Sequence, residues 1–126
     1  MRIIAGVQYN EHTNPIFNKF GILKLNDIYK VEIAKMIFLF KQNALPEPLK
    51  GLFTENRDIH TKPTRQQNNL YMKRCRTTLA SQHISCTGPK IWNSFPSDIK
   101  NVSLTSLNIH CFTTKVKKHF LQDYVV

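Results

Sequence analysis

The sequence predicts a mainly α-helical fold with one small β-hairpin, and three stretches carry that prediction. In the first, residues 25–40, eleven of the sixteen side chains are apolar. In the second, near the C-terminus, apolar residues recur at helical spacing. The third, residues 88–96, holds the only tryptophan, with a proline at each side of it. A chain of 126 residues is expected to form one compact unit that buries roughly two-thirds of its surface.

A short helix is predicted within residues 12–23. Asn14 is its expected N-cap, Pro15 its first residue and Gly21 its end, because each residue type is favoured at that place. The residues predicted to share its apolar face are Ile16, Phe17 and Phe20.

Residues 25–40 form the strongest predicted helix. Asn26 is the expected N-cap, and Asp27 places a negative charge at the positive end of the helix dipole. Beyond Met36 the helix is apolar all round, which indicates burial on most sides. Alternatively, the apolar face of Ile28–Phe40 docks a protein partner or lies on a membrane surface. Leu45-Pro46 breaks the helix, and a short turn is expected to close at Leu52-Phe53.

A polar loop is predicted at 54–69, which separates a helical segment (1–53) from a C-terminal segment (70–126). Residues 70–76 and 82–86 are predicted to be the two strands of a hairpin, because polar and apolar side chains partly alternate there.

The segment Gly88–Pro96 predicts a rigid elbow. Gly88 suits a tight turn, and Pro89 suits the first position of a helix. Trp92 and Phe95 would then project from one face as structural anchors, and Pro96 would stop the turn.

The last predicted elements are a helical turn at Ser97–Lys100 and a final helix. Ser103 or Thr105 is the expected cap, and the helix is expected to run to about Leu121. The residues of its predicted apolar stripe are Leu104, Leu107, Cys111, Phe112, Val116 and Phe120.

The charge of the chain is strongly basic, with 18 Lys and Arg against 8 Asp and Glu, a net charge of +10. Residues 57–126 carry eleven of the bases but only three of the acids, and no acid lies between Asp58 and Asp98. A field of one sign favours a polyanion as partner, although a basic surface also serves solubility alone. We therefore predict sequence-tolerant binding of RNA or DNA through phosphate contacts. The predicted binding residues are Lys62, Arg65, Lys73, Arg74, Arg76, Lys90, Lys115, Lys117 and Lys118.

Two further readings of this region stay open. Tyr71 could stack on an unpaired base or be a half-buried strand aromatic. His83 and Cys86 form a single pair with zinc-like spacing, and no second pair repeats it, so we expect no metal and a buried Cys86.

We expect no catalysis and no cofactor, because the chain has no glycine-rich phosphate loop, no nucleophile elbow and no adjacent aspartate pair. Three cysteines and no signal-like N-terminus favour reduced thiols in the cytoplasm or nucleus. The longest apolar run, Met36–Phe40, is far shorter than the roughly 18 residues of a membrane span.

A set of motifs, in one order along nearly the whole chain, resembles the C-terminal region of reverse transcriptases from non-LTR retrotransposons. The motifs are Arg2-Ile3-Ile4-Ala5-Gly6, His12-Thr13-Asn14-Pro15-Ile16-Phe17, Ile22-Leu23, Leu25, Asp27-Ile28-Tyr29-Lys30, Leu45-Pro46, His60, Thr64-Arg65, Arg74-Cys75-Arg76-Thr77, Gly88-Pro89-Lys90-Ile91-Trp92-Asn93-Ser94-Phe95-Pro96 and Ser106-Leu107.

This resemblance implies a thumb-like helical subdomain followed by a compact basic tail, which together help to hold template and primer. It implies an RNA-directed DNA polymerase as the parent activity, with the palm and its catalytic aspartates upstream of the region seen here. The chain itself is then expected to be a non-catalytic, nucleic-acid-binding fragment.

Overall fold

The computed structural model of the chain describes residues 1–105 and 108–125. Helices account for most of this part, and none of it forms a strand of a sheet. The mainly α-helical prediction is therefore confirmed and the predicted hairpin is wrong. The elements are α1 (Arg2–Ala5), α2 (Asn14–Phe20), α3 (Leu25–Lys41), a 3-10 helix η1 (Glu47–Leu52), α4 (Asn56–Ile59), α5 (Thr78–Ser81), α6 (Ile84–Ser94), α7 (Ser97–Thr105) and α8 (Ile109–Gln122).

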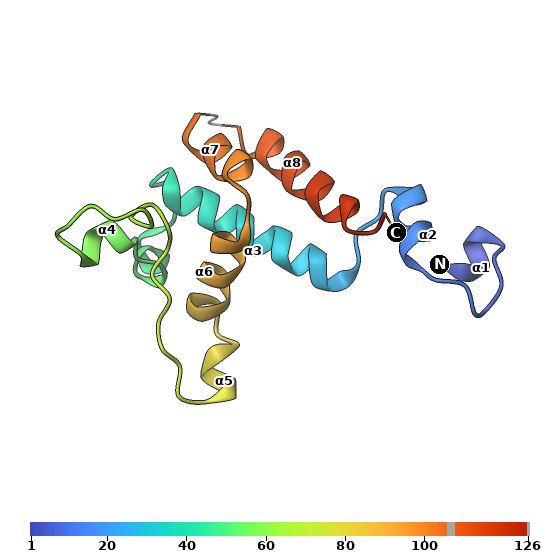
Figure 1. The fold of residues 1–126 in the computed structure, drawn as a ribbon, viewed down its shortest axis with the longest axis horizontal. Coiled ribbons are helices and arrows are strands. Elements are labelled where there is room, and N and C mark those ends of the chain that lie inside the picture. Colours follow the sequence, from blue (N-terminus) through green and yellow to red (C-terminus); the bar gives the residue numbers. More distant parts are fainter. Residues whose placement is uncertain (106–107, 126) are drawn as a thin grey trace.

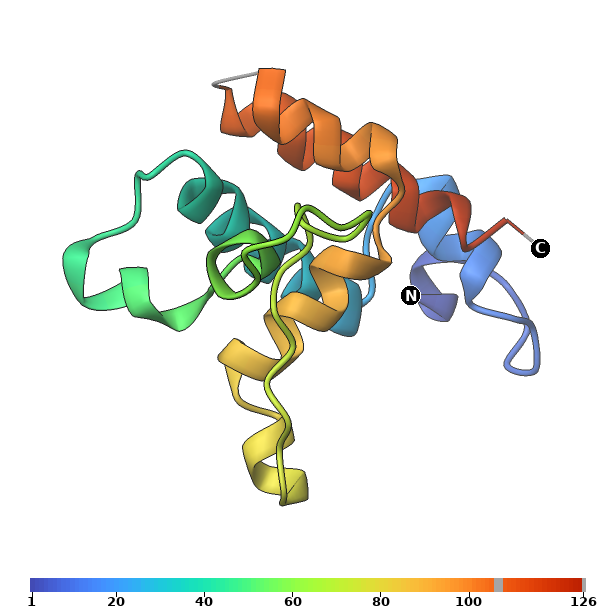
Figure 2. The same cartoon turned by 60° about the vertical axis from the view of Figure 1, so that its left-hand side comes forward.

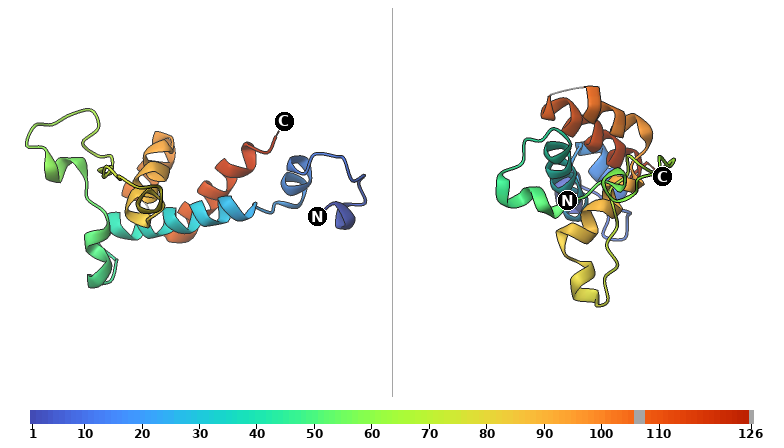
Figure 3. Two further views of the ribbon diagram at one scale, coloured as in Figure 1. Left: turned by 90° about the horizontal axis from the view of Figure 1, so that it is seen from below. Right: turned by 90° about the vertical axis from the view of Figure 1, so that its left-hand side faces the viewer.

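The long helix α3 runs through the middle of the molecule, and α6 and α8 lie across it (Figures 1 and 3). Its bounds agree with the prediction, but its N-cap is Lys24 rather than Asn26. Ile37 and Phe38 are buried and Met36 is half-buried, so the apolar half of the helix is covered as predicted. The long apolar stretch is thus the centre of the core.

Helix α8 packs on α3 through an i, i+4 stripe of Phe112, Val116 and Phe120. The Phe112 ring stacks on Phe38 with 4.7 Å between ring centroids. The predicted start was wrong, because Asn108 caps this helix with a side-chain oxygen that accepts from the His110 N–H (2.9 Å).

Other predictions for the C-terminal region concern the cap and the apolar stripe of the last helix. Ser103 and Thr105, the predicted caps, belong to α7 instead. Cys111, predicted to lie in the apolar stripe, is exposed. The side chains of Leu104 and Leu107 lie outside the described residues.

Helix α6 carries the tryptophan segment, but not as an elbow. The helix begins at Ile84, so Gly88 and Pro89 lie inside it rather than before it. Gly88 has a packing reason instead: a Cβ placed there would lie 2.6 Å from the Phe53 ring. Trp92 and Phe95 are 1% and 4% exposed, and both belong to the hydrophobic core. The helix ends at Ser94, two residues before Pro96, as expected for residues that precede a proline.

The residues predicted to form a hairpin make an irregular arm, residues 71–83, that includes α5. Tyr71, Met72, Lys73 and Arg74 are all exposed, so neither face of an extended strand there would be buried. An isolated hairpin without a packed face is marginal in water, and the chain instead makes α5, capped by Thr77 Oγ1 accepting from the Ala80 N–H (3.2 Å). Of the predicted second strand, 82–86, the last three residues form the first turn of α6, and His83 is the N-cap of that helix. The arm projects away from α3 (Figure 2). Among the described helices, α5 packs against the adjacent α6.

The N-terminal helix α2 starts one residue earlier than predicted, with Thr13 at the N-cap and Pro15 second, and it ends at Gly21 in the left-handed conformation (φ 62°) as predicted. Ile16 is buried, whereas Phe20 is 42% exposed and does not belong to the core.

Across the described residues, no helix combines the length and apolar character that crossing a bilayer requires.

Candidate nucleic-acid interface

The polar loop 54–69 is fixed at both ends by a short antiparallel pairing of Glu55 with Leu70. The Asn56 N–H donates to the Asn69 carbonyl (3.0 Å), and the Tyr71 N–H donates to the Thr54 carbonyl (2.8 Å). The loop therefore leaves and rejoins the body of the molecule at one point, and it contains α4 between these ends.

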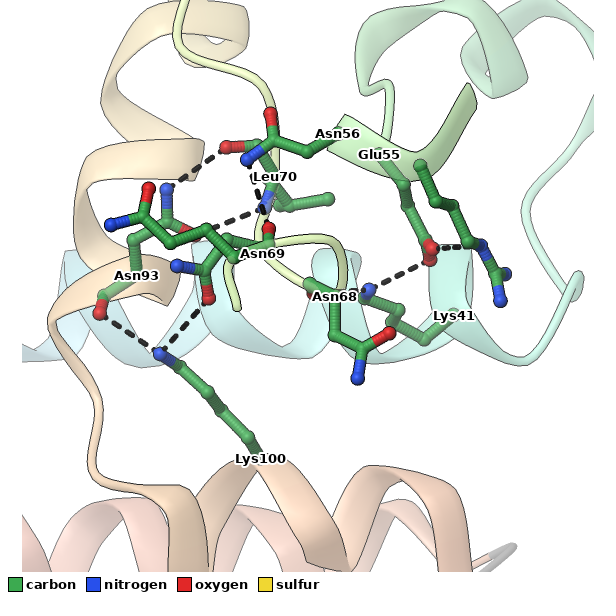
Figure 4. A network of polar contacts seen from close by, with 10 residues as sticks. Lys41, Glu55, Asn56, Asn68, Asn69, Leu70, Asn93 and Lys100 are labelled. Carbon is green, nitrogen blue, oxygen red and sulfur yellow. Dashed lines mark hydrogen bonds and ion pairs between the residues drawn. The ribbon is translucent and has the colours of Figure 1, made fainter. Parts of the chain in front are cut away.

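Asn93 of α6 completes this pairing from the other side (Figure 4). Its side-chain amide accepts from the Leu70 N–H (3.0 Å) and donates to the Leu70 carbonyl (2.9 Å). Leu70 itself is 1% exposed, so both of its backbone polar groups are satisfied where water does not reach. The side chain of Asn93 thus does for Leu70 what a neighbouring strand would do.

A buried ion pair ties the same loop to the end of α3. The Lys41 Nζ lies 2.7 Å from the Glu55 carboxylate, and each side chain is 8% exposed. Arg57 Nε lies 2.5 Å from the other carboxylate oxygen, and Lys41 also donates to the Asn68 carbonyl (3.1 Å). One carboxylate therefore serves two cations, which leaves this corner of the molecule with an excess of positive charge.

Lys100 of α7 approaches the same corner from the opposite side (Figure 4). Its Nζ donates to the Asn93 carbonyl (2.9 Å) and reaches Asn69 Oδ1 (3.5 Å). Burial lowers the pKa of this ammonium, and repulsion from Lys41 lowers it further. Two lysines from different helices are thus held close enough to repel each other.

These residues surround a pocket of about 310 Å³. We call it the Lys100 pocket; the charged residues that line it are Lys41, Glu55, Arg57, Arg65 and Lys100. Of these, only Arg65 was predicted from the sequence. The other three cations come from α3, α4 and α7, and no spacing in the sequence shows that these segments meet.

The predicted cations of the arm lie together. Lys73, Arg74 and Arg76 are exposed and line a shallow pocket of about 550 Å³ with Cys75 and Cys86. The pKa of the Cys75 thiol is raised, first by a hydrogen bond with the Cys86 thiol, while Lys90 and Lys73 act in the opposite direction. Lys90 of α6 therefore lies near the arm, and it joins this group.

The remaining predicted cations fall into two other places. Lys62 and Arg65 line a pocket of about 590 Å³ in the loop beside α4. Lys115, Lys117 and Lys118 are exposed on α8, on the other side of the molecule from the arm (Figures 1 and 2). The predicted cations thus fall into three groups, which lie in the loop, on the arm with Lys90, and on α8.

The ion pairs of the described residues lie in another part of the chain. Within residues 1–105 and 108–125, the ion pairs all join residues between Asp27 and Arg57. None of the predicted binding cations takes part in an ion pair within that part of the chain. Their charge is therefore not neutralised by the protein.

The described residues contain no group of three or more His, Cys, Asp and Glu side chains that could hold a metal ion. Cys86 is buried, as predicted, and His83 serves as the N-cap of α6, with Nδ1 accepting from the Ser85 N–H (3.3 Å). Tyr71 is 37% exposed and lies outside any strand, so its ring is accessible.

Comparison of the chain with known protein families, with curated proteins and with solved structures finds no match.

Proposed function

We propose that the chain is a non-catalytic nucleic-acid-binding module, equivalent to the thumb and tail region of a non-LTR retrotransposon reverse transcriptase. One observation carries the proposal: the cations of residues 62–90 are exposed and have no ion-pair partner in the described part of the chain. Cations that take part in no ion pair are suited to displace counterions from a phosphate backbone.

The mode of binding follows from the kind of residue involved. Arg65, Lys73, Arg74, Arg76 and Lys90 contact phosphates, the α8 lysines assist at longer range, and Tyr71 offers a ring on which an unpaired base stacks. Apart from the single turn α5, the arm is irregular and offers no long helix or two-stranded ribbon to read base edges, so the binding is tolerant of sequence.

The test is a salt titration of binding to a short fluorescent DNA duplex, followed by anisotropy. With about five phosphates neutralised, the logarithm of the association constant is expected to fall with the logarithm of salt concentration at a slope of about −4.5. Binding that salt does not weaken, or no binding at low salt, would contradict the proposal.

Two triple variants with equal loss of charge test where the strand lies. K73Q/R74Q/R76Q, in the arm, is expected to make the slope less steep by about 2.7. K115Q/K117Q/K118Q, on α8, is the matched control and is expected to change the slope by much less. Equal effects of the two variants would show that the net charge acts without a defined surface.

A second candidate function is docking of a protein partner on the first turns of α3. Leu25, Ile28 and Tyr29 are 81%, 43% and 52% exposed, an apolar patch at the uncovered end of the Ile28–Phe40 helix. Self-association or partner capture that L25S/I28S abolishes, with nucleic-acid affinity unchanged, would favour this function. A monodisperse monomer in light scattering would argue against it.

A further inference from the structure

We propose that the Lys100 pocket binds a phosphate monoester, such as the terminal phosphate of a nucleic-acid strand or that of a free nucleotide. The inference deepens the proposed function, since a strand end is the source that this function would supply. The pocket is separate from the exposed arm cations Lys73, Arg74 and Arg76, which do not line it.

The charge of the pocket indicates an anion. Four cations line it against the single carboxylate of Glu55, which leaves three positive charges. A monoester carries a charge of about −1.5 to −2 near neutral pH, whereas an internal phosphodiester carries one charge. The monoester therefore balances the pocket more completely.

The two lysines are held in place before any ligand arrives. Lys41 is nine-tenths buried against Glu55, and Lys100 is fixed by the Asn93 carbonyl. Burial lowers the pKa of Lys100 and repulsion from Lys41 lowers it further, and an anion between the two lysines would relieve that repulsion. A site whose cations are already positioned loses little entropy on binding.

Neutral donors and size fit the same ligand. Ser97, the first residue of α7, lines the pocket together with Asn69 and Asn101, and α7 presents its positive dipole end there. Asp98, the next residue, is exposed and does not line the pocket. A volume of about 310 Å³ is at the small end of ligand sites, enough for a phosphate with its sugar but not for a duplex.

The first experiment compares two single-stranded oligonucleotides of one sequence, with and without a 5′-phosphate, by anisotropy. We expect the phosphorylated strand to bind about tenfold more tightly, the gain expected from a charge-assisted hydrogen bond. R65Q, in the pocket, should reduce this ratio to about one. K62Q, the matched control three residues away and outside the pocket, should weaken both strands equally and keep the ratio.

The second experiment uses no strand, so it separates the two proposals. Adenosine monophosphate and adenosine are titrated into ¹⁵N-labelled protein, with inorganic phosphate as a further probe. We expect the monophosphate and phosphate, but not adenosine, to shift the amide signals of Asn69, Ser97 and Lys100, and K100Q to abolish the shifts.

The outcomes are distinct. If the monophosphate shifts these signals while no oligonucleotide binds, the pocket is confirmed and the proposed function fails. If both oligonucleotides bind equally and the monophosphate shifts no pocket amide, the pocket inference is wrong and the proposed function stands. Binding of the phosphorylated strand that R65Q and K62Q weaken by the same ratio also overturns the inference.

Discussion

The body around α3 and the segment 54–83 are held by different forces. In the body, Ile37, Phe112 and Val116 have no exposed surface, and helices meet through stacked aromatic rings. In the segment, most side chains are exposed and the chain is fixed at a few polar points, chiefly Asn93 with Leu70 and Lys41 with Glu55. The stability of the molecule therefore resides in the body, whereas the segment 54–83 is held at few points and carries the exposed cations Lys62, Arg65, Lys73, Arg74 and Arg76.

This separation means that the two regions should respond differently to substitution. Loss of a core side chain removes apolar burial and leaves a cavity, whereas loss of an anchoring amide frees only the chain that it holds. The variants below test that difference, in order of decreasing expected effect.

Trp92→Ala should have the largest effect, because it removes the largest of the fully buried side chains in the described part. We expect a loss of about 3–5 kcal/mol in the free energy of unfolding, measured by urea denaturation. Tyr71→Ala, an exposed aromatic of the arm, is the control and should cost less than about 0.5 kcal/mol. Similar losses for the two would remove the distinction between the regions.

Gly88→Ala should destabilise the chain by about 1–3 kcal/mol, because the new Cβ would overlap the Phe53 ring. Gly51→Ala is the matched control, since a Cβ there meets no atom within 4 Å. In the double variant with Phe53→Leu, the cost of Gly88→Ala should shrink. Additive costs in this cycle would show that close packing on Phe53 is not the reason for the glycine.

Tyr124→Phe tests a polar link within the body. The Tyr124 hydroxyl donates to the buried Asp27 carboxylate and accepts from the Lys24 N–H (3.0 Å). Burial raises the pKa of Asp27, but hydrogen bonds from Lys30 and Tyr124 outweigh it, so the pKa lies below its ordinary value. We expect a loss of about 1.5–3 kcal/mol at neutral pH.

The pH dependence of that loss has a definite sign. A carboxylate whose pKa is lower in the folded state stabilises the fold above its unfolded pKa, about 3.9, and this contribution disappears as pH falls through the folded pKa. The difference between the wild type and Tyr124→Phe should therefore shrink below about pH 4. Tyr29→Phe, on an exposed tyrosine, should show no such trend in thermal unfolding measured across this range.

Asn93→Ala should have the smallest global effect and the most local one. It leaves the Leu70 N–H and carbonyl without their partner, and we expect the arm to open rather than the core. Amide exchange should accelerate at Leu70 and Tyr71 and stay slow in α3, with about 1 kcal/mol lost overall. Ser94→Ala, one residue on and exposed, is the control. Faster exchange throughout α3 would contradict local anchoring.

The sequence predicted the body much better than the segment that carries the charge. The burial of Trp92, the bounds of α3 and the end of α2 at Gly21 follow from local rules of apolar spacing and helix termini. The partial alternation at 70–76 was misleading, because the side chains from Tyr71 to Arg74 are all exposed and neither face of a strand there would be buried. Gly88 suggested a turn, while its reason is the ring of Phe53, far away in the sequence.

The candidate site was predictable only in part for the same physical reason. The high density of Lys and Arg between residues 62 and 90 can be seen directly in the sequence. That Lys41, Arg57 and Lys100 converge on one pocket depends on how α3, α4 and α7 pack, which no spacing encodes. In the sequence alone, these three residues look like ordinary surface charges.

The closure of residues 56–69 at the Glu55–Leu70 pairing has a practical consequence for engineering. Because both ends of this excursion are tied at one place, lengthening it changes the closure entropy only logarithmically. The protein should therefore tolerate a foreign peptide or fluorescent tag inserted beside the exposed Pro63, while α3, α6 and α8 keep their arrangement.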